Sequence, residues 1–441
     1  MHASGRRGTG RRRLAALPLA GVLLLTGCPA PPPSAEPLPP PPSPSTSAAR
    51  PTPARPVYEG PPPGAPPSAG PLTTLRASVD LTPAMPGHFS RAEAAVAAPD
   101  GGAYVVVSPE RRPGRSPEPS PPQQLVTVAG AGGGFALTRS VPIPAVADVS
   151  AVHLLPDGAV AVSGRLQDAG VPGGGYGFHV VDPATGAGRT TTVPYGEGAV
   201  SSFGHSALSP DGRTMYLFLS VATRTGVRER LIAVDAVTGA VVAARDLRGA
   251  VAAVSEAPAG HEVAGLVPRP GGGVTLAFDA APDPIRRERV PTLLTFGADL
   301  QPGGEPVGVT TLSEGGETQA IAAGADGTVF LVVEVTEGAW ILAVPDAGIA
   351  GPVLVQLADH LYDYALAVEP AQVWGLLPAY EGVRAVDLTT EEIRGPVGVG
   401  CPGQDVRGLV AAPEGALVIG QCNSPRTRTQ MLWFIGPDGG P

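Results

Sequence analysis

One turn that recurs seven times constrains this 441-residue chain more than any other feature of its sequence. Each copy lies between two short apolar stretches, and the middle residues of successive copies are 43 to 60 residues apart. Pro at the first position presets φ, and Gly at the third tolerates a positive φ, so each turn can close a β-hairpin. The copies are Pro99-Asp100-Gly101, Pro156-Asp157-Gly158, Pro210-Asp211-Gly212, Pro270-Gly271-Gly272, Ala325-Asp326-Gly327, Pro370-Ala371-Gln372 and Pro413-Glu414-Gly415.

A period of this length is close to one four-stranded blade of a β-propeller. The chain contains 60 Gly and 54 Pro, and no segment keeps a 3.6-residue apolar period, which favours short strands over helices. Length alone would suggest two or three domains in the last roughly 370 residues, but the repetition favours one. We therefore predict an all-β, seven-bladed β-propeller over residues 73–441, with strand A before each turn and strand B after it.

A second recurring turn carries a resemblance to known propeller repeats. It is found in Val181-Asp182-Pro183-Ala184-Thr185-Gly186, in Val234-Asp235-Ala236-Val237-Thr238-Gly239 and in Val386-Asp387-Leu388-Thr389-Thr390. These segments resemble the Val-Asp-x-x-Thr-Gly turns of YVTN-type and quinoprotein-type propellers. The resemblance implies that the Asp and Thr side chains cap the backbone between strands C and D. It implies a fold and no activity.

Counting strands predicts how the ring closes. The seventh repeat supplies strand A (Gly408 to Ala412), strand B (Ala416 to Gly420) and strand C (Met431 to Ile435), with no chain left for strand D. Thr73 to Leu81, upstream of the first repeat, has the pattern of the D strands. We expect this segment to complete the last blade, because it would cover an otherwise exposed sheet edge.

The N-terminus has the pattern of an export signal over residues 1–27. Arginines at 6, 7 and 11–13 precede an apolar run, Leu14 to Leu25, that is too short to span a bilayer. The run ends in Leu25-Thr26-Gly27-Cys28, which resembles the lipobox of bacterial lipoproteins and implies that the Cys28 thiol is linked to diacylglycerol. The alternative is an ordinary signal peptide with a chance cysteine. Both the general and the twin-arginine export routes fit the basic start.

Residues 28–72 follow as the lipidated cysteine and a tether rich in Pro, Ala and Ser. Such a composition cannot offset the entropy of ordering, so we expect an extended, solvated segment. The sequence thus predicts an extracytoplasmic domain in a bacterial cell envelope, anchored to the membrane by lipid.

The two remaining cysteines, Cys401 and Cys422, flank the hairpin centred on Glu414. Exported proteins are the setting in which cysteines pair, so we predict a disulfide between them; the alternative is two free thiols. A zinc site is disfavoured because neither cysteine has a Cys-x-x-Cys partner or a nearby histidine.

Catalytic motifs are missing from the sequence. It contains no Gly-x-Ser-x-Gly, no His-Glu-x-x-His and no phosphate-binding glycine loop with its lysine. This pattern favours a binding or assembly module without a cofactor over an enzyme.

One set of positions could nevertheless form a site at the mouth of the propeller channel. Eight residues before each turn stand Arg91, Asp148, Ser202, Glu262, Glu317, Tyr362 and Asp405, with His205 nearby. The carboxylates among them could hold Ca²⁺, which prefers several oxygen ligands. The alternative function is therefore a lactonase-like hydrolase with a cation at this mouth. The simpler interpretation is a solvated polar rim.

The distribution of charge along the sequence suggests a second candidate binding surface. Removal of the five arginines in the signal peptide takes the net charge from −9 to −14, which disfavours nucleic acid as a partner. The B-to-C loops nevertheless gather arginines on one expected face, called here the top face, which could bind an anionic polymer or an acidic envelope protein. The alternative is that exposed loops in a chain without lysine simply collect arginine. The arginines are Arg111, Arg112, Arg115, Arg165, Arg224, Arg228, Arg230, Arg286, Arg287, Arg289, Arg426 and Arg428.

Overall fold

The computed structural model describes part of the chain, and the predicted signal peptide and most of the tether lie outside that part. In the described residues, no helix is both long and apolar enough to span a membrane. The described residues are 68 and 70–437, except 111–120, 132–133, 168–173, 196–198, 225, 253–262, 282–288, 310–315, 337, 346–352, 358–364, 380–381, 402, 414 and 425–426.

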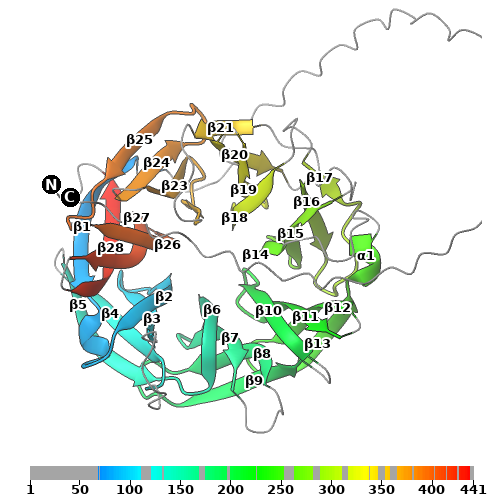
Figure 1. Ribbon diagram of the computed structural model, residues 1–441, viewed down its shortest axis with the longest axis horizontal. Helices are drawn as coiled ribbons and strands as arrows, with labels where there is room; N and C mark the ends of the chain where they lie inside the picture. The colour runs from blue at the N-terminus through cyan, green and yellow to red at the C-terminus, as the bar shows by residue number, and fades with distance from the viewer. Residues whose placement is uncertain are drawn as a thin grey trace, which may run out of the picture. The chain divides into compact units, whose positions relative to one another are not determined.

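Seven antiparallel four-stranded sheets are arranged as blades around a ring (Figure 1), so the predicted seven-bladed β-propeller is confirmed. Strand A of each blade faces the centre. Blade 1 contains β2 (Ser90–Ala97), β3 (Ala103–Pro109), β4 (Gln124–Ala131) and β5 (Gly134–Pro142). Blade 2 contains β6 (Val146–Leu154), β7 (Val160–Leu166), β8 (Gly175–Val181) and β9 (Gly188–Pro194). Blade 3 contains β10 (Ala199–Leu208), β11 (Thr214–Thr223), β12 (Gly226–Asp235) and β13 (Val241–Asp246).

The second half of the ring follows the same order. Blade 4 contains β14 (Val263–Pro268), β15 (Val274–Ala280), β16 (Val290–Phe296) and β17 (Val307–Gly308). Blade 5 contains β18 (Glu317–Ala323), β19 (Val329–Val335), β20 (Gly338–Val344) and β21 (Val353–Leu357). Blade 6 contains β22 (Ala367–Val368), β23 (Trp374–Ala379), β24 (Gly382–Asp387) and β25 (Ile393–Val397). Blade 7 contains β26 (Gln404–Ala412), β27 (Gly415–Asn423), β28 (Arg428–Pro437) and β1 (Leu72–Asp80), while η1 (Thr82–Ala84) and α1 (Arg248–Ala252) are short connecting helices.

The recurring turns are held by their own side chains. Asp100 accepts a hydrogen bond from the backbone N–H of Gly102 at 3.0 Å, and Gly101 adopts φ +80°, a conformation that favours glycine. Between strands C and D of blade 3, Asp235 accepts from the backbone N–H and the hydroxyl of Thr238 at 2.6 and 2.9 Å. These short-range bonds explain why the turns could be found in the sequence.

The hydrophobic core is divided into seven clusters, and each fills the junction between two neighbouring blades. Phe178 of blade 2, for example, packs in one cluster with Met215 of blade 3, and both side chains are fully buried. Burying one such side chain contributes about 1.5–3 kcal/mol. Each blade is therefore covered on both faces by its neighbours, and an open ring would expose apolar faces of its end blades.

Closure is made by the N-terminal strand. β1 pairs antiparallel with β28, so the blue and red ends of the chain lie side by side in Figure 1. Leu81 ends the segment by donating its backbone N–H to the Gln430 carbonyl at 2.8 Å. This is the pairing that the sequence predicts for Thr73 to Leu81, displaced by one residue because the turn into η1 begins at Leu81.

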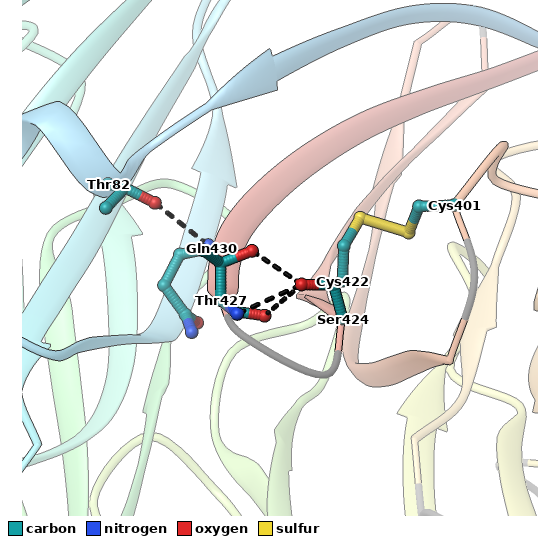
Figure 2. Close-up of a disulfide and its surroundings, with 6 residues drawn as sticks. All are labelled: Thr82, Cys401, Cys422, Ser424, Thr427 and Gln430. Carbon is teal, nitrogen blue, oxygen red and sulfur yellow. Dashed lines mark hydrogen bonds between the residues drawn. A yellow bond between two sulfur atoms is a disulfide. The ribbon is translucent and has the colours of Figure 1, made fainter.

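Blade 7 also carries the predicted disulfide, which is confirmed (Figure 2). Cys401, just before β26, is bonded to Cys422 near the end of β27, with 5.7 Å between their Cα atoms. β27 and β28 are longer than the strands that the sequence predicts. The connection between them is stabilised by the Thr427 N–H, which donates to the Ser424 hydroxyl at 3.0 Å.

Candidate functional site

Five inner strands share a bulge at the same distance from the turn that follows them. In β2 the register shifts between Ala92 and Ala94, and the same shift occurs at the matching position of β6, β14, β18 and β26. A bulge re-aims side chains and commonly lies beside functional sites. The extra residues at these positions are Glu93, Ser150, Ala264, Gln319 and Arg407.

The channel holds a cavity of about 300 Å³ below the mouth, lined by residues from several inner strands that include Ser150, Ser206 and Gln319. His205, which the sequence predicts near the mouth, lines this cavity and has its ring against those of Phe203 and Phe218. Burial lowers the pKa of His205 below its usual value. His205 is therefore a neutral group of the channel wall at neutral pH.

A hydrogen-bonded cluster, absent from the sequence-based expectations, joins blades 2 and 3 beside this cavity. His153 Nε2 lies 2.9 Å from Ser206 Oγ, and Ser206 Oγ lies 2.5 Å from Ser163 Oγ. Ser150 Oγ lies 2.6 Å from the Tyr176 hydroxyl. Burial lowers the pKa of His153 to about 4 and raises that of Tyr176 to about 12, so both are neutral near pH 7. A neutral imidazole can accept the Ser206 proton.

The three described carboxylates that the sequence predicts at the channel mouth do not come together as a metal site. Asp148 contacts Arg165 at 2.7 Å, Glu317 contacts Arg289 at 3.3 Å, and Asp405 contacts Arg407 at 3.0 Å. Among the residues that the structure describes, no three acidic, histidine or cysteine side chains form a group that could hold a metal ion. Each guanidinium already neutralises its carboxylate. Glu262 and Tyr362 of the predicted set lie outside the described residues, whereas Arg91 and Ser202 lie in β2 and β10.

The top-face arginines that the structure describes divide into two groups. Arg165 and Arg289 pair as above, and Arg428 lies 3.2 Å from Glu110. Arg224, Arg228 and Arg230 are exposed on the β11–β12 hairpin of blade 3, and no described residue pairs with them. These three are called the arginine surface below. The other predicted top-face arginines lie outside the described residues: Arg111, Arg112, Arg115, Arg286, Arg287 and Arg426.

A larger pocket, not anticipated from the sequence, lies between blades 1 and 2 at the top face. It encloses about 710 Å³ and is lined by charged and amide side chains and by four prolines. The polar and charged lining residues are Arg91, Glu93, Ser108, Gln123, Asp148, Arg165 and Gln167, and the prolines are Pro109, Pro121, Pro122 and Pro144. No local motif marks it, because the residues come from two blades and the loops between their strands.

Comparisons with known proteins identify the architecture. No family model matches the chain. No curated protein matches it either. Puromycin hydrolase has a similar solved structure at 15% identity and a TM-score of 0.50, over 84% of this chain and 55% of that one. A point mutant of puromycin hydrolase in complex with PGG matches at 16% identity and a TM-score of 0.52, over 78% of this chain and 51% of that one. The chain thus spans about half the length of these structures, and the likeness shows that it shares their propeller fold.

Proposed function

We propose that this protein is a binding module of the bacterial cell envelope that holds an anionic polymer on its arginine surface. The observation that carries the proposal is the contrast within the top face. Arg224, Arg228 and Arg230 are exposed and without a carboxylate partner among the described residues, whereas Arg165 and Arg289 are paired.

The geometry of the hairpin suits a repeating anion. Arg228 and Arg230 are alternate residues of β12, so their side chains leave the same face of the strand about 7 Å apart. A guanidinium presents a planar set of donors that match carboxylate or phosphate oxygens. Asp246 lies opposite Arg230 in the register of β12 and β13, and its charge limits the attraction at that end. Loops on a rigid scaffold are common places for binding residues.

The proposal can be tested with two anionic polymers, polyphosphate and poly-L-glutamate, titrated into the full protein. The triple variant R224E/R228E/R230E should lose binding while its melting temperature stays within a few degrees of the wild type. The matched control is R213E, because Arg213 is exposed at the opposite end of the same blade. Binding should weaken as salt rises toward physiological strength, where the screening length is about 8 Å. Equal affinity of the triple variant and the wild type, or no binding by the wild type, would refute the arginine surface.

Membrane attachment is the second part of the proposal. The lipobox-like ending at Cys28 and the Pro-rich tether support a diacylglycerol anchor and a position outside the cytoplasm. A tether of this kind would hold the propeller within reach of envelope polymers or of an acidic envelope protein.

Hydrolysis is the second candidate function. Puromycin hydrolase, which shares the propeller fold, acts as a hydrolase by its name, and Ser206 and His153 form a hydroxyl–imidazole pair beside the channel cavity. In such a pair the imidazole takes the hydroxyl proton as the oxygen attacks. Covalent labelling of the wild type by a fluorophosphonate, lost in S206A, would favour this function.

A further inference from the structure

We infer that the pocket between blades 1 and 2 is a binding site for an uncharged saccharide. Its volume of about 710 Å³ falls within the usual range of small-molecule sites, roughly 300–1,000 Å³. It is separate from the arginine surface, which belongs to blade 3, so the two sites can be tested independently.

The first support is a buried acceptor that has no donor. Gln123 is 7% exposed, and its Nε2 donates to the Ala147 carbonyl at 2.8 Å. Since a carbonyl can only accept, this bond fixes which end of the amide is nitrogen and leaves Oε1 as the other end. In the described part of the chain, Gln123 Oε1 has no hydrogen-bond partner. A buried acceptor of this kind is costly to leave unpaired, and a ligand hydroxyl or N–H would satisfy it.

Gln123 is held in place by hydrogen bonds to both its backbone and its side chain. Its backbone carbonyl accepts from Ile143 N–H at 2.8 Å, and its side chain is bonded to Ala147, the extra residue at the bulge between Val146 and Asp148. The bulge leaves the Ala147 carbonyl available for that bond. The orientation of the acceptor is thus fixed before a ligand arrives.

The second support is the charge of the walls. Arg91 lies 3.2 Å from Glu93, and Arg165 lies 2.7 Å from Asp148, so two cations balance two anions around the pocket. Because the charges of these walls cancel, the pocket offers no net electrostatic attraction to a strongly charged ligand. Each ion pair presents a guanidinium donor beside a carboxylate acceptor.

The chemistry of these walls matches a polyol. A hydroxyl both donates and accepts, so two neighbouring hydroxyls can donate to a carboxylate and accept from its arginine without separating the ion pair. A peptide N–H only donates and a peptide carbonyl only accepts, so a peptide would need one fixed alignment at each pair. The prolines have no backbone N–H and offer rigid apolar walls to the C–H faces of a sugar ring.

The test is a calorimetric titration of the full protein with two uncharged disaccharides, cellobiose and N,N′-diacetylchitobiose. A capped, uncharged tetrapeptide serves as the competing ligand class. We expect at least one disaccharide to bind the wild type and D148N to weaken that binding about tenfold or more, since a hydrogen bond to a charged group is lost. The matched control is E392Q, because Glu392 is also an exposed carboxylate paired with an arginine, Arg394, but lies on blade 6 outside the pocket.

A second variant distinguishes loss of the binding site from loss of the fold. Gln167 is exposed and lines the pocket, so Q167W should fill the pocket and abolish binding while the melting temperature stays unchanged. The variant R224E/R228E/R230E should bind the disaccharide normally, whatever its effect on polyanions. The inference is overturned if neither disaccharide binds, if binding survives in D148N and Q167W, or if only the tetrapeptide binds.

Discussion

The carboxylate of Asp279 in blade 4 accepts two hydrogen bonds from Thr318 in blade 5, one from its backbone N–H at 2.9 Å and one from its hydroxyl at 2.6 Å. Asp279 is completely buried. Burial raises the pKa of Asp279 to about 6, although Thr318 and the charge of Arg289 act in the opposite direction. This single side chain therefore joins two blades, and its raised pKa leads us to expect a junction whose stability depends on pH.

The first prediction concerns that junction. A carboxyl whose folded pKa is raised from 3.8 to about 6 contributes stability at low pH that is lost as the pH rises through 6. The stability of the wild type relative to D279N should therefore fall between pH 4 and pH 7, by up to about 3 kcal/mol at 1.36 kcal/mol per unit. Urea unfolding at several pH values measures this difference. A stability difference between the wild type and D279N that does not change with pH would contradict the raised pKa of Asp279.

The second prediction has the opposite sign. The pKa of His153 is lowered from 6.5 to about 4, so its contribution to stability is complete above pH 6.5 and is lost as the pH falls toward 4. The stability of the wild type relative to H153Q should fall by up to about 3 kcal/mol from pH 7 to pH 4. Urea unfolding at the same pH values measures this difference. The comparison of the wild type with D279N is the internal control, because there the stability difference changes with pH in the opposite direction.

The third prediction concerns the disulfide. Replacing both cysteines in C401S/C422S should lower the free energy of unfolding by about 3 kcal/mol, because the unfolded chain loses a cross-link. Peptide mapping of the non-reduced wild type should find Cys401 joined to Cys422. Equal melting temperatures for the wild type and the double variant would show that the bond does not stabilise blade 7.

The fourth prediction concerns ring closure. Deleting residues 29–67 should leave the melting temperature nearly unchanged, because the deletion stops short of β1. Deleting residues 29–80 removes β1 and exposes the edge of β28, so the whole propeller should lose stability. Calorimetry of the two truncations makes the comparison, and similar unfolding temperatures would argue against closure by this strand.

The fifth prediction concerns the anchor. Replacing Cys28 by Ser removes the thiol that the lipobox-like sequence presents, so the variant should lose its lipid and leave the detergent phase. Mass spectrometry of the wild type should find acyl chains on the peptide that begins at Cys28. A C28S protein that still carries acyl chains would disprove the assignment.

The sequence by itself determined the features that depend on nearby residues. The turns at Asp100 and Asp235 are held by bonds that span only two or three residues, so their pattern reveals seven hairpins and hence seven blades. The strand count assigned β1 to blade 7, since a missing outer strand has one economical replacement. The disulfide followed from a short hairpin that brings Cys401 and Cys422 together.

Only the tertiary structure decided which side chains meet across blades. Counting eight residues back from each turn located Asp148, Glu317 and Asp405, but it could not show that each one faces an arginine. Side chains alternate along a strand, so a one-residue bulge moves every later side chain to the other face. Ala147 is the extra residue of one such bulge in blade 2, and its carbonyl accepts the hydrogen bond of Gln123 from blade 1. His153 and Ser206 belong to different blades, and their contact depends on how the two sheets pack, which no local pattern records.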